Sequence, residues 1–308
     1  MKKQEERIED FTVERIQQMV AHNEERTEAR VSFSPDLTVV LGGRPSTSVG
    51  SMLRAAVPYR IEQARLGFIV QGRANVCLNL QDYCLEAGMA LFAADGSILQ
   101  INSCSPDAEL IAMAVSEEML SSIFGMHKPQ LLRQGRAGCY FPLSPHAQDV
   151  ALRCFRLLYD LAQQGTPMRP AAAGIVASLF HLYDALYAQH VAQAANEDML
   201  AARPKHVFDR FLRLVTQHCT HEREIAFYAQ QLCLSPRYLG TLVLQASGST
   251  AKWWIDRAVI TEAKVQLRHT TLSAEQIADA LHFPSPSFFS KYFKRLTGLT
   301  PWQYRKSL

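Results

Sequence analysis

The last hundred residues contain a unit that occurs twice, with corresponding positions fifty residues apart. A duplicated unit constrains folding strongly, because each copy must form the same local structure and bury its apolar side chains against a neighbour. We call residues 225–254 the first repeat and residues 274–304 the second repeat. The matching positions are 235–239 (SPRYL) with 285–289 (SPSFF), 247–250 (SGST) with 297–300 (TGLT), Val243 with Phe293, and Trp254 with Tyr304.

Each repeat carries the start and stop signals of two short helices. Serine followed by proline, at 235–236 and 285–286, begins a helix, because the hydroxyl caps a free N–H and proline fits the first helical position. The helix then ends at Gly248 or Gly298, since glycine suits the left-handed position after a helix. A shorter helix precedes each one, at 225–232 and 274–281, after a connection of three or four residues. The sequence therefore predicts two helix-turn-helix units, whose second helices can enter the major groove of DNA.

The segment between the repeats predicts a rigid spacer. Residues 251–268 contain no glycine or proline and end in Arg268-His269, which suit a helix C-terminus. A helix of this length measures roughly 27 Å at about 1.5 Å per residue. Successive major-groove segments on one face of DNA lie about 34 Å apart. The spacer is therefore suited to holding two reading helices near that separation.

The charge of the chain is unevenly distributed. Residues 203–308 carry 15 Lys and Arg against 7 Asp and Glu, a net of +8, whereas residues 1–202 carry 17 against 22, a net of −5. A basic module joined to an acidic part indicates a polyanionic partner for the basic module. The charge and the two helix-turn-helix units thus point to the same ligand, DNA.

The second repeat and the residue after it also contain a long, specific pattern, formed by Ile277-Ala278, Phe283, Ser287, Phe289-Ser290, Phe293-Lys294, Gly298, Thr300-Pro301 and Tyr304-Arg305. This pattern resembles the signature of AraC/XylS-type transcription regulators, and the resemblance covers residues 205–308. Two positions depart from it. His282 stands where a glycine is usual. In the first repeat, Val243-Leu244 stand where these regulators often have an aromatic residue followed by a basic residue.

The resemblance implies a sequence-specific DNA-binding regulator, an activator rather than a repressor, that acts on double-stranded DNA with RNA polymerase. Such regulators commonly place a cupin-like barrel and a helical dimerisation segment ahead of the DNA-binding module. The resemblance therefore implies that the chain forms a homodimer and binds a small-molecule effector in the barrel. The alternative from another class is a ligand-binding or interaction protein whose basic module docks an acidic protein.

The helical register divides the residues of each second helix between core and DNA. Phe289 and Phe293 lie four residues apart on one face and are expected in the core, as are Leu239, Leu242 and Val243. The residues left outward are candidates for reading base edges: Arg237, Tyr238, Gly240, Thr241, Ser287, Ser290 and Lys291. Three further basic residues are expected to contact phosphate: Lys294, Arg295 and Arg305. Trp254 is expected in the core, and the role of Trp253 stays open.

The rest of the chain predicts an α+β protein. Short apolar runs with turn signals between them, over residues 31–115, indicate a small β-barrel or sandwich, and we expect the cupin-like barrel. Apolar positions at helical spacing in 150–161 and 175–191 indicate helices. The expected domains are a charged helix (1–30), the barrel (31–120), a helical dimerisation segment (121–202) and the DNA-binding domain (203–308). The first helix either lies on the next domain or forms a short dimeric coil.

Several function classes find no support in the sequence. Residues 31–115 contain no histidine, so a metal-binding cupin is not expected. P-loop, GxGxxG and GxSxG motifs are absent, so we expect no enzyme, no cofactor and no metal. The seven cysteines lack zinc-ligand spacing, and the chain shows neither an export signal nor a run of about 18 apolar residues. These features favour a cytoplasmic protein without a membrane partner.

Overall fold

The computed structural model describes residues 30–43, 57–133, 138–165, 168–197 and 202–307. These residues fall into two compact units, which we describe separately: a sheet unit (30–197) and a helical module (202–307). The mixture of α and β structure that the sequence predicts is confirmed. The expected N-terminal helix lies outside the described residues.

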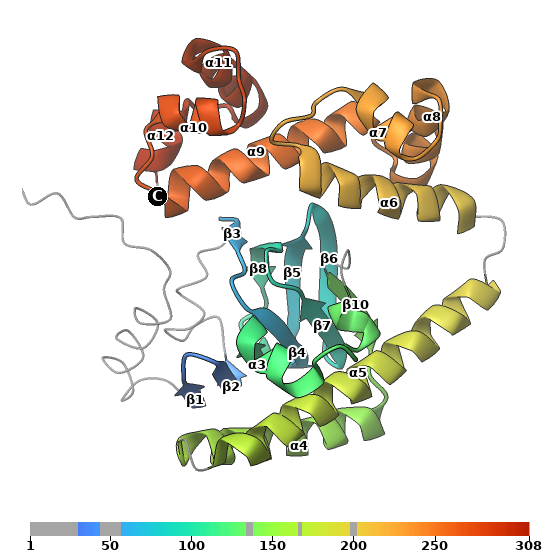
Figure 1. The fold of residues 1–308 in the computed structure, drawn as a ribbon, viewed down its shortest axis with the longest axis vertical. Coiled ribbons are helices and arrows are strands. Elements are labelled where there is room, and N and C mark those ends of the chain that lie inside the picture. The colour runs from blue at the N-terminus through green and yellow to red at the C-terminus, as the bar shows by residue number, and fades with distance from the viewer. Residues whose placement is uncertain (1–29, 44–56, 134–137, 166–167, 198–201, 308) are drawn as a thin grey trace, which may run out of the picture. The chain divides into compact units, whose positions relative to one another are not determined.

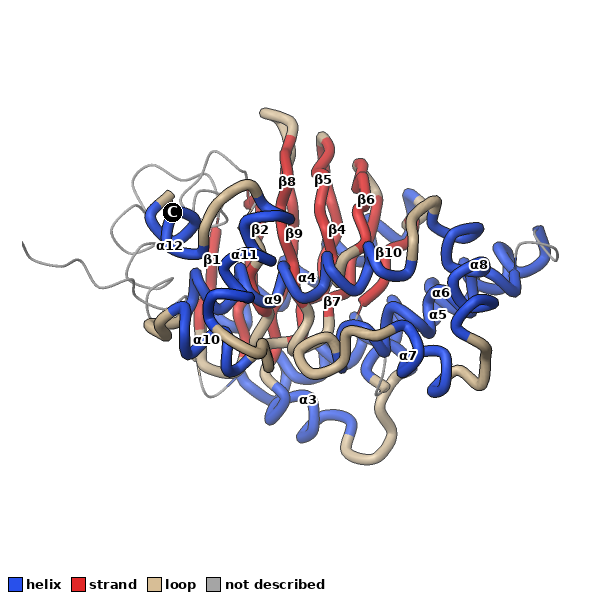
Figure 2. The backbone as a smooth tube through the Cα atoms, turned by 90° about the horizontal axis from the view of Figure 1, so that it is seen from above, coloured by secondary structure: helices blue, strands red, loops and turns tan. Residues whose placement is uncertain are grey.

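The sheet unit contains two antiparallel sheets, whose strands are red in Figure 2. The six-stranded sheet has the order β1 (Arg30–Phe33), β2 (Leu37–Gly43), β9 (Glu109–Val115), β4 (Ala64–Gln71), β7 (Met89–Ala93) and β10 (Gly138–Pro142). The four-stranded sheet has the order β3 (Tyr59–Arg60), β8 (Ile98–Cys104), β5 (Arg73–Leu78) and β6 (Gln81–Glu86). In β4, successive side chains alternate between two separate apolar cores, Leu66 and Phe68 in one and Ile69 in the other.

The cupin-like barrel expected from the sequence is not a closed barrel. Among the described residues, β1 and β10 form the two edges of the six-stranded sheet, and no ladder joins that sheet to the four-stranded one. Closure requires pairing between strands that are distant in sequence. The local apolar pattern predicts where strands lie but carries no information on that pairing, which is why the prediction failed.

Two helices cover one face of the six-stranded sheet. Phe68 of β4 contacts Phe155 of α4 (Pro145–Gln163), with ring centroids 6.3 Å apart. Phe92 of β7 contacts Phe180 of α5 (Arg169–Glu197) at 6.2 Å. All four rings are buried. Residues 169–193 are long and apolar enough to cross a membrane by length and composition. Buried residues of α5, including Phe180, nevertheless belong to the core that it shares with the sheet.

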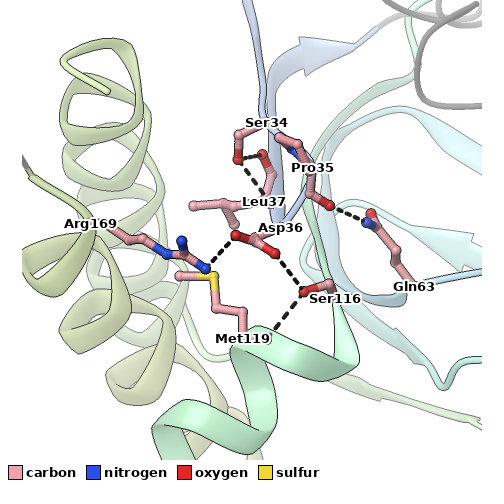
Figure 3. Close-up of polar contacts among 8 residues, drawn as sticks. All are labelled: Ser34, Pro35, Asp36, Leu37, Gln63, Ser116, Met119 and Arg169. Carbon is pink, nitrogen blue, oxygen red and sulfur yellow. Dashed lines mark hydrogen bonds and ion pairs between the residues drawn. The ribbon is translucent and has the colours of Figure 1, made fainter. Parts of the chain in front are cut away.

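A polar network joins the β1–β2 turn to the starts of two helices (Figure 3). Asp36 pairs with Arg169 at the start of α5 and accepts a 3.2 Å hydrogen bond from Ser116 Oγ. Ser116 caps α3 (Glu117–Phe124), because its Oγ accepts from the backbone N–H of Met119 at 3.1 Å. On the other side of the turn, Gln63 Nε2 donates to the carbonyl of Pro35. One turn thereby fixes how both helices begin.

The helical module contains two helix-turn-helix units connected by a long helix. The first unit is formed by α7 (Ile225–Gln231) and α8 (Pro236–Ser247), and the second by α10 (Ala274–Ala280) and α11 (Pro286–Thr297). The connecting helix α9 (Ala251–His269) has one unit at each end (Figure 1). Helix α6 (Ala202–His218) packs on α8 and α9, and α12 (Pro301–Lys306) packs on the far end of α9.

Candidate nucleic-acid interface

The two helix-turn-helix units begin and end their second helices in the same way. The hydroxyls of Ser235 and Ser285 each accept a 3.2 Å hydrogen bond from the backbone N–H three residues later. Both helices end at a glycine in the left-handed region, Gly248 at φ 69° and Gly298 at φ 81°. The caps and stops predicted from the repeat are therefore confirmed, and α8 and α11 are equivalent helices.

The turns of the two units share a backbone conformation. In each turn one residue other than glycine adopts a positive φ, which glycine adopts most easily. Cys233 (φ 57°) and His282 (φ 53°) lie in the left-handed region, one residue after the C-cap of α7 and of α10. In each turn the next backbone N–H donates a 2.8 Å hydrogen bond to a carbonyl of the preceding helix. Leu234 donates to the carbonyl of Ala229, and Phe283 donates to the carbonyl of Ala278. His282 thus adopts the conformation that a glycine would adopt freely.

One face of each second helix lies in the core of the module. Leu239, Leu242 and Val243 of α8 are buried. The residues fifty positions later, Phe289, Tyr292 and Phe293 of α11, are buried as well. The rings of Phe289 and Phe293 lie 5.9 Å apart, and Phe293 contacts Tyr304 of α12 at 5.6 Å. The core register expected from the sequence is confirmed, and it fixes which residues face outward.

Five positions are exposed in both helices, and we call the residues at these positions the reading face of each helix. On α8 they are Arg237, Tyr238, Thr241, Leu244 and Gln245, and on α11 they are Ser287, Phe288, Lys291, Lys294 and Arg295. All ten are exposed, and the five positions correspond pairwise across the repeat. Neither helix contains an aspartate or glutamate. The two reading faces therefore occupy corresponding positions but differ in charge, with three positive charges on α11 and one on α8.

Two of the expected outward residues are less accessible. Gly240 is half-buried, and a Cβ atom there would lie 3.8 Å from Cδ1 of Ile225 on α7. Ser290, at the equivalent position in α11, is half-buried too. Leu244, Gln245 and Phe288 are exposed but are not among the residues that the sequence predicts to read DNA, although Phe288 is 54% exposed. The pairing of Phe288 with Tyr238 across the repeat was the signal that could have identified it.

Arg305, which is expected to contact phosphate, also makes contacts inside the module. Its Nε donates to the carbonyl of Leu267 at 3.0 Å and one of its terminal nitrogens donates to Leu272 at 2.6 Å. Burial lowers the pKa of this guanidinium. These bonds fasten α12 to the end of α9 and to the segment after it.

The two adjacent tryptophans diverge as helical geometry requires. Trp254 is buried, its Nε1 donates to Ser247 Oγ at 2.8 Å, and its ring contacts Phe208 of α6 at 5.2 Å. Trp253 is 45% exposed, with the guanidinium of Arg257 5.1 Å from its ring centre. Trp254 thus belongs to the core, as expected, and Trp253 belongs to the surface.

No metal-binding cluster is present in the described part of the chain, where no three His, Cys, Asp or Glu side chains come together in a way that could hold an ion.

Comparison with known proteins agrees with this geometry. A family described as a helix-turn-helix domain matches residues 228–307. The arabinose operon regulatory protein of Salmonella typhimurium is 33% identical over 82 residues, which are 27% of this chain and 29% of that protein. The transcriptional activator RhaR of Cronobacter sakazakii is 31% identical over 87 residues, 27% of this chain and 31% of that protein. The chain thus spans about a third of the length of these relatives.

Among solved structures, ToxT from Vibrio cholerae, determined with unsaturated fatty acid bound, aligns over 92% of this chain and 98% of its own, with a TM-score of 0.39 and 15% identity. A regulator with an AraC-type DNA-binding domain from Chromobacterium violaceum aligns over 34% of this chain and 95% of its own, with a TM-score of 0.32 and 22% identity. The two matched relatives are, by name, an operon regulatory protein and a transcriptional activator. Residues 228–307 of this chain therefore match a helix-turn-helix domain and are similar in sequence to the matched part of these transcription regulators.

Proposed function

We propose that the chain is a sequence-specific DNA-binding regulator of transcription. The observation that carries the proposal is the pair of corresponding reading faces on α8 and α11, whose charged residues are all basic. The two helices that bear them lie at the two ends of α9 (Figure 1). At about 1.5 Å per residue, the 19 residues of α9 measure about 28 Å. This length is comparable to the ~34 Å between successive major-groove segments on one side of DNA.

Within each reading face we assign two kinds of contact. Arg237 and Lys291 lie in the N-terminal half of their helices, where recognition helices contact base edges, and both can donate to guanine. Tyr238, Thr241 and Ser287 are proposed to assist them. Lys294 and Arg295 lie in the last turn of α11 and are proposed to bind phosphate. The exposed ring of Phe288 suits contact with a thymine methyl group.

The mode of regulation and the partners are proposed from the similarity of the helical module to its matched relatives. We propose activation as the mode of regulation, because one matched relative is a transcriptional activator. RNA polymerase is then the expected protein partner, and the cytoplasm the expected location. We further propose that residues 31–120 bind a small-molecule effector and that residues 121–202 form a homodimer. An effector acts only if it binds the DNA-competent arrangement with an affinity different from that for the other arrangement.

Selection of genomic DNA fragments by the purified protein tests the proposal. We expect recovered fragments to share a sequence, and that sequence to bind at least ~1,000-fold more tightly than a scrambled duplex. The genes beside the recovered sites would indicate the regulon and the chemistry of the effector. Recovery of fragments with no common sequence would contradict the proposal and favour a basic module that docks an acidic protein.

A further inference from the structure

Arg223 lies outside the repeated part of the module. It stands in the six residues between α6 and α7, two residues before α7 begins. The position two residues before α10 is occupied by Leu272, so the second unit has no arginine equivalent to Arg223. The duplication therefore does not account for Arg223.

The side chain of Arg223 reaches across to the turn of the second unit. One terminal nitrogen donates to the carbonyl of Leu281, the C-cap of α10, and the guanidinium carbon lies 3.7 Å from the ring centre of Phe283. A positive charge stabilises the C-terminal end of a helix, and a guanidinium over an aromatic face is a cation–π contact. Burial lowers the pKa of Arg223. The rings of His221 and His282, 4.1 Å apart, make a second contact between the same segments.

Phe283 connects this contact to the reading helix of the second unit. Its ring lies 5.1 Å from Phe289 and 5.2 Å from Tyr292, both on the buried face of α11. The hydroxyl of Tyr292 donates at 2.7 Å to Asp256 of α9. The orientation of α11 is thus fixed from two sides, by α9 through Asp256 and by the entry to α7 through Arg223.

We propose that Arg223 is a positioning residue that holds α11 in register with α8 and thereby sets the spacing of the two DNA half-sites. The inference rests on the proposed function, because it presupposes that both reading helices bind DNA. When two binding elements are joined, the second binds as if at high local concentration only if the connection matches the span between their sites. A stiff connection therefore gives tight binding at one spacing and weak binding at others. A looser connection lowers the affinity at the matched spacing and also reduces the loss of affinity at other spacings.

The test compares wild type, Arg223→Met, Arg223→Lys and the control Arg213→Met, which removes an exposed arginine of α6. Each full-length protein is titrated on three duplexes: the selected site, the same site with one base pair inserted between its halves, and a site with the second half scrambled. One inserted base pair moves the second half by ~3.4 Å and rotates it by about a tenth of a turn. Tryptophan fluorescence during urea unfolding monitors folding of the module, since all three tryptophans lie in it.

We expect the insertion to weaken wild type by about 100-fold and Arg223→Met by less than ~10-fold. On the selected site Arg223→Met should bind about tenfold more weakly than wild type, with unchanged affinity for the half-scrambled site. Arg223→Lys keeps the charge and a donor, so the inserted base pair should weaken its binding almost as much as it weakens wild type. Arg213→Met should bind all three duplexes as wild type does. An Arg223→Met protein that keeps the wild-type penalty overturns the inference, whatever its absolute affinity.

Two further outcomes complete the test, one for a variant that does not fold and one for the proposed function itself. If Arg223→Met does not fold, Phe283→Leu, which keeps apolar volume and removes the ring face, must show the relaxed spacing instead, and a wild-type penalty there also overturns the inference. If wild type binds the selected site no better than a scrambled duplex, the proposed function itself fails.

Discussion

At the scale of single residues, Lys291 and Lys294 test the division between base and phosphate contacts. Lys291→Ala should weaken binding to the selected site by ~1–3 kcal/mol and relax the preference at one base pair. Lys294→Ala should weaken all duplexes about equally and lower the salt slope by about one unit. Titration of each variant on selected and scrambled duplexes at several salt concentrations distinguishes the two. A parallel loss on both duplexes for Lys291→Ala would show that this lysine does not read bases.

Arg237 and Arg295 provide a second pair of the same kind. Arg237→Ala should resemble Lys291→Ala and Arg295→Ala should resemble Lys294→Ala, because the members of each pair occupy the same half of a reading helix. Lys291→Ala should cost more than Arg237→Ala, since α11 carries two further positive charges and α8 carries none. The same titrations give the ranking, and a larger loss for Arg237→Ala would place the dominant contact in the first unit.

The left-handed residues of the two turns predict a gain in stability. Cys233→Gly and His282→Gly should each stabilise the module by about 1 kcal/mol, because a side chain in this backbone region costs about 1–2 kcal/mol that glycine avoids. Urea unfolding followed by tryptophan fluorescence measures the change. Arg210→Gly, at an exposed position within α6, is the control and should destabilise by about 1 kcal/mol. Destabilisation by Cys233→Gly would mean that the thiol makes a contact worth more than the backbone strain.

The sequence predicts local roles of residues well and long-range roles poorly. Ser285 as a cap and Gly298 as a stop could be predicted, because their partners lie within a few residues. Arg305 and Arg223 could not, because the carbonyls they bind lie between 33 and 58 residues away. An exposed basic residue and one that fastens two helices together look alike in sequence, and only the fold distinguishes them.

At the scale of elements, a close approach between strands gives a matched pair of predictions. A Cβ atom on Gly67 of β4 would lie 2.3 Å from the carbonyl oxygen of Ile111 in β9, so Gly67→Ala should destabilise the sheet unit by ~1–3 kcal/mol. Gly174, in α5, has open space where a Cβ would be, so Gly174→Ala should stabilise by ~0.5–1 kcal/mol. Thermal unfolding followed by circular dichroism checks both, and equal effects of the two changes would contradict the strand packing.

The elements that the sequence analysis missed are those with weak apolar patterns. Strands β2, β4, β5, β7, β8 and β9 overlap the short apolar runs predicted within residues 31–115. Strand β6 (Gln81–Glu86) was missed because it has only one buried position, Leu85. Strand β10 (Gly138–Pro142) was missed because it follows a helix and pairs with β7, far from it in sequence. Strand existence is thus encoded locally where the strand is buried, whereas sheet membership depends on distant partners.

At the scale of the whole molecule, the uneven charge predicts that DNA binding resides in the C-terminal part. Residues 203–308 carry the net +8 and both reading faces, so this fragment should bind duplex DNA without the rest of the chain. Its affinity should fall as salt rises, because binding releases counterions from the phosphates. A mobility-shift titration with the folded fragment checks this. A folded fragment that binds no DNA would mean that the N-terminal part contributes directly to the interface.

The most direct test of the central claim, that the two reading faces together recognise DNA, is a salt titration of the full chain on selected and scrambled duplexes. We predict that log affinity falls linearly with log salt on both, by about 0.9 for each phosphate contact. We also predict that the selected duplex binds at least ~1,000-fold more tightly at each salt concentration. Affinity that does not respond to salt, or that is equal on the two duplexes, would contradict the claim.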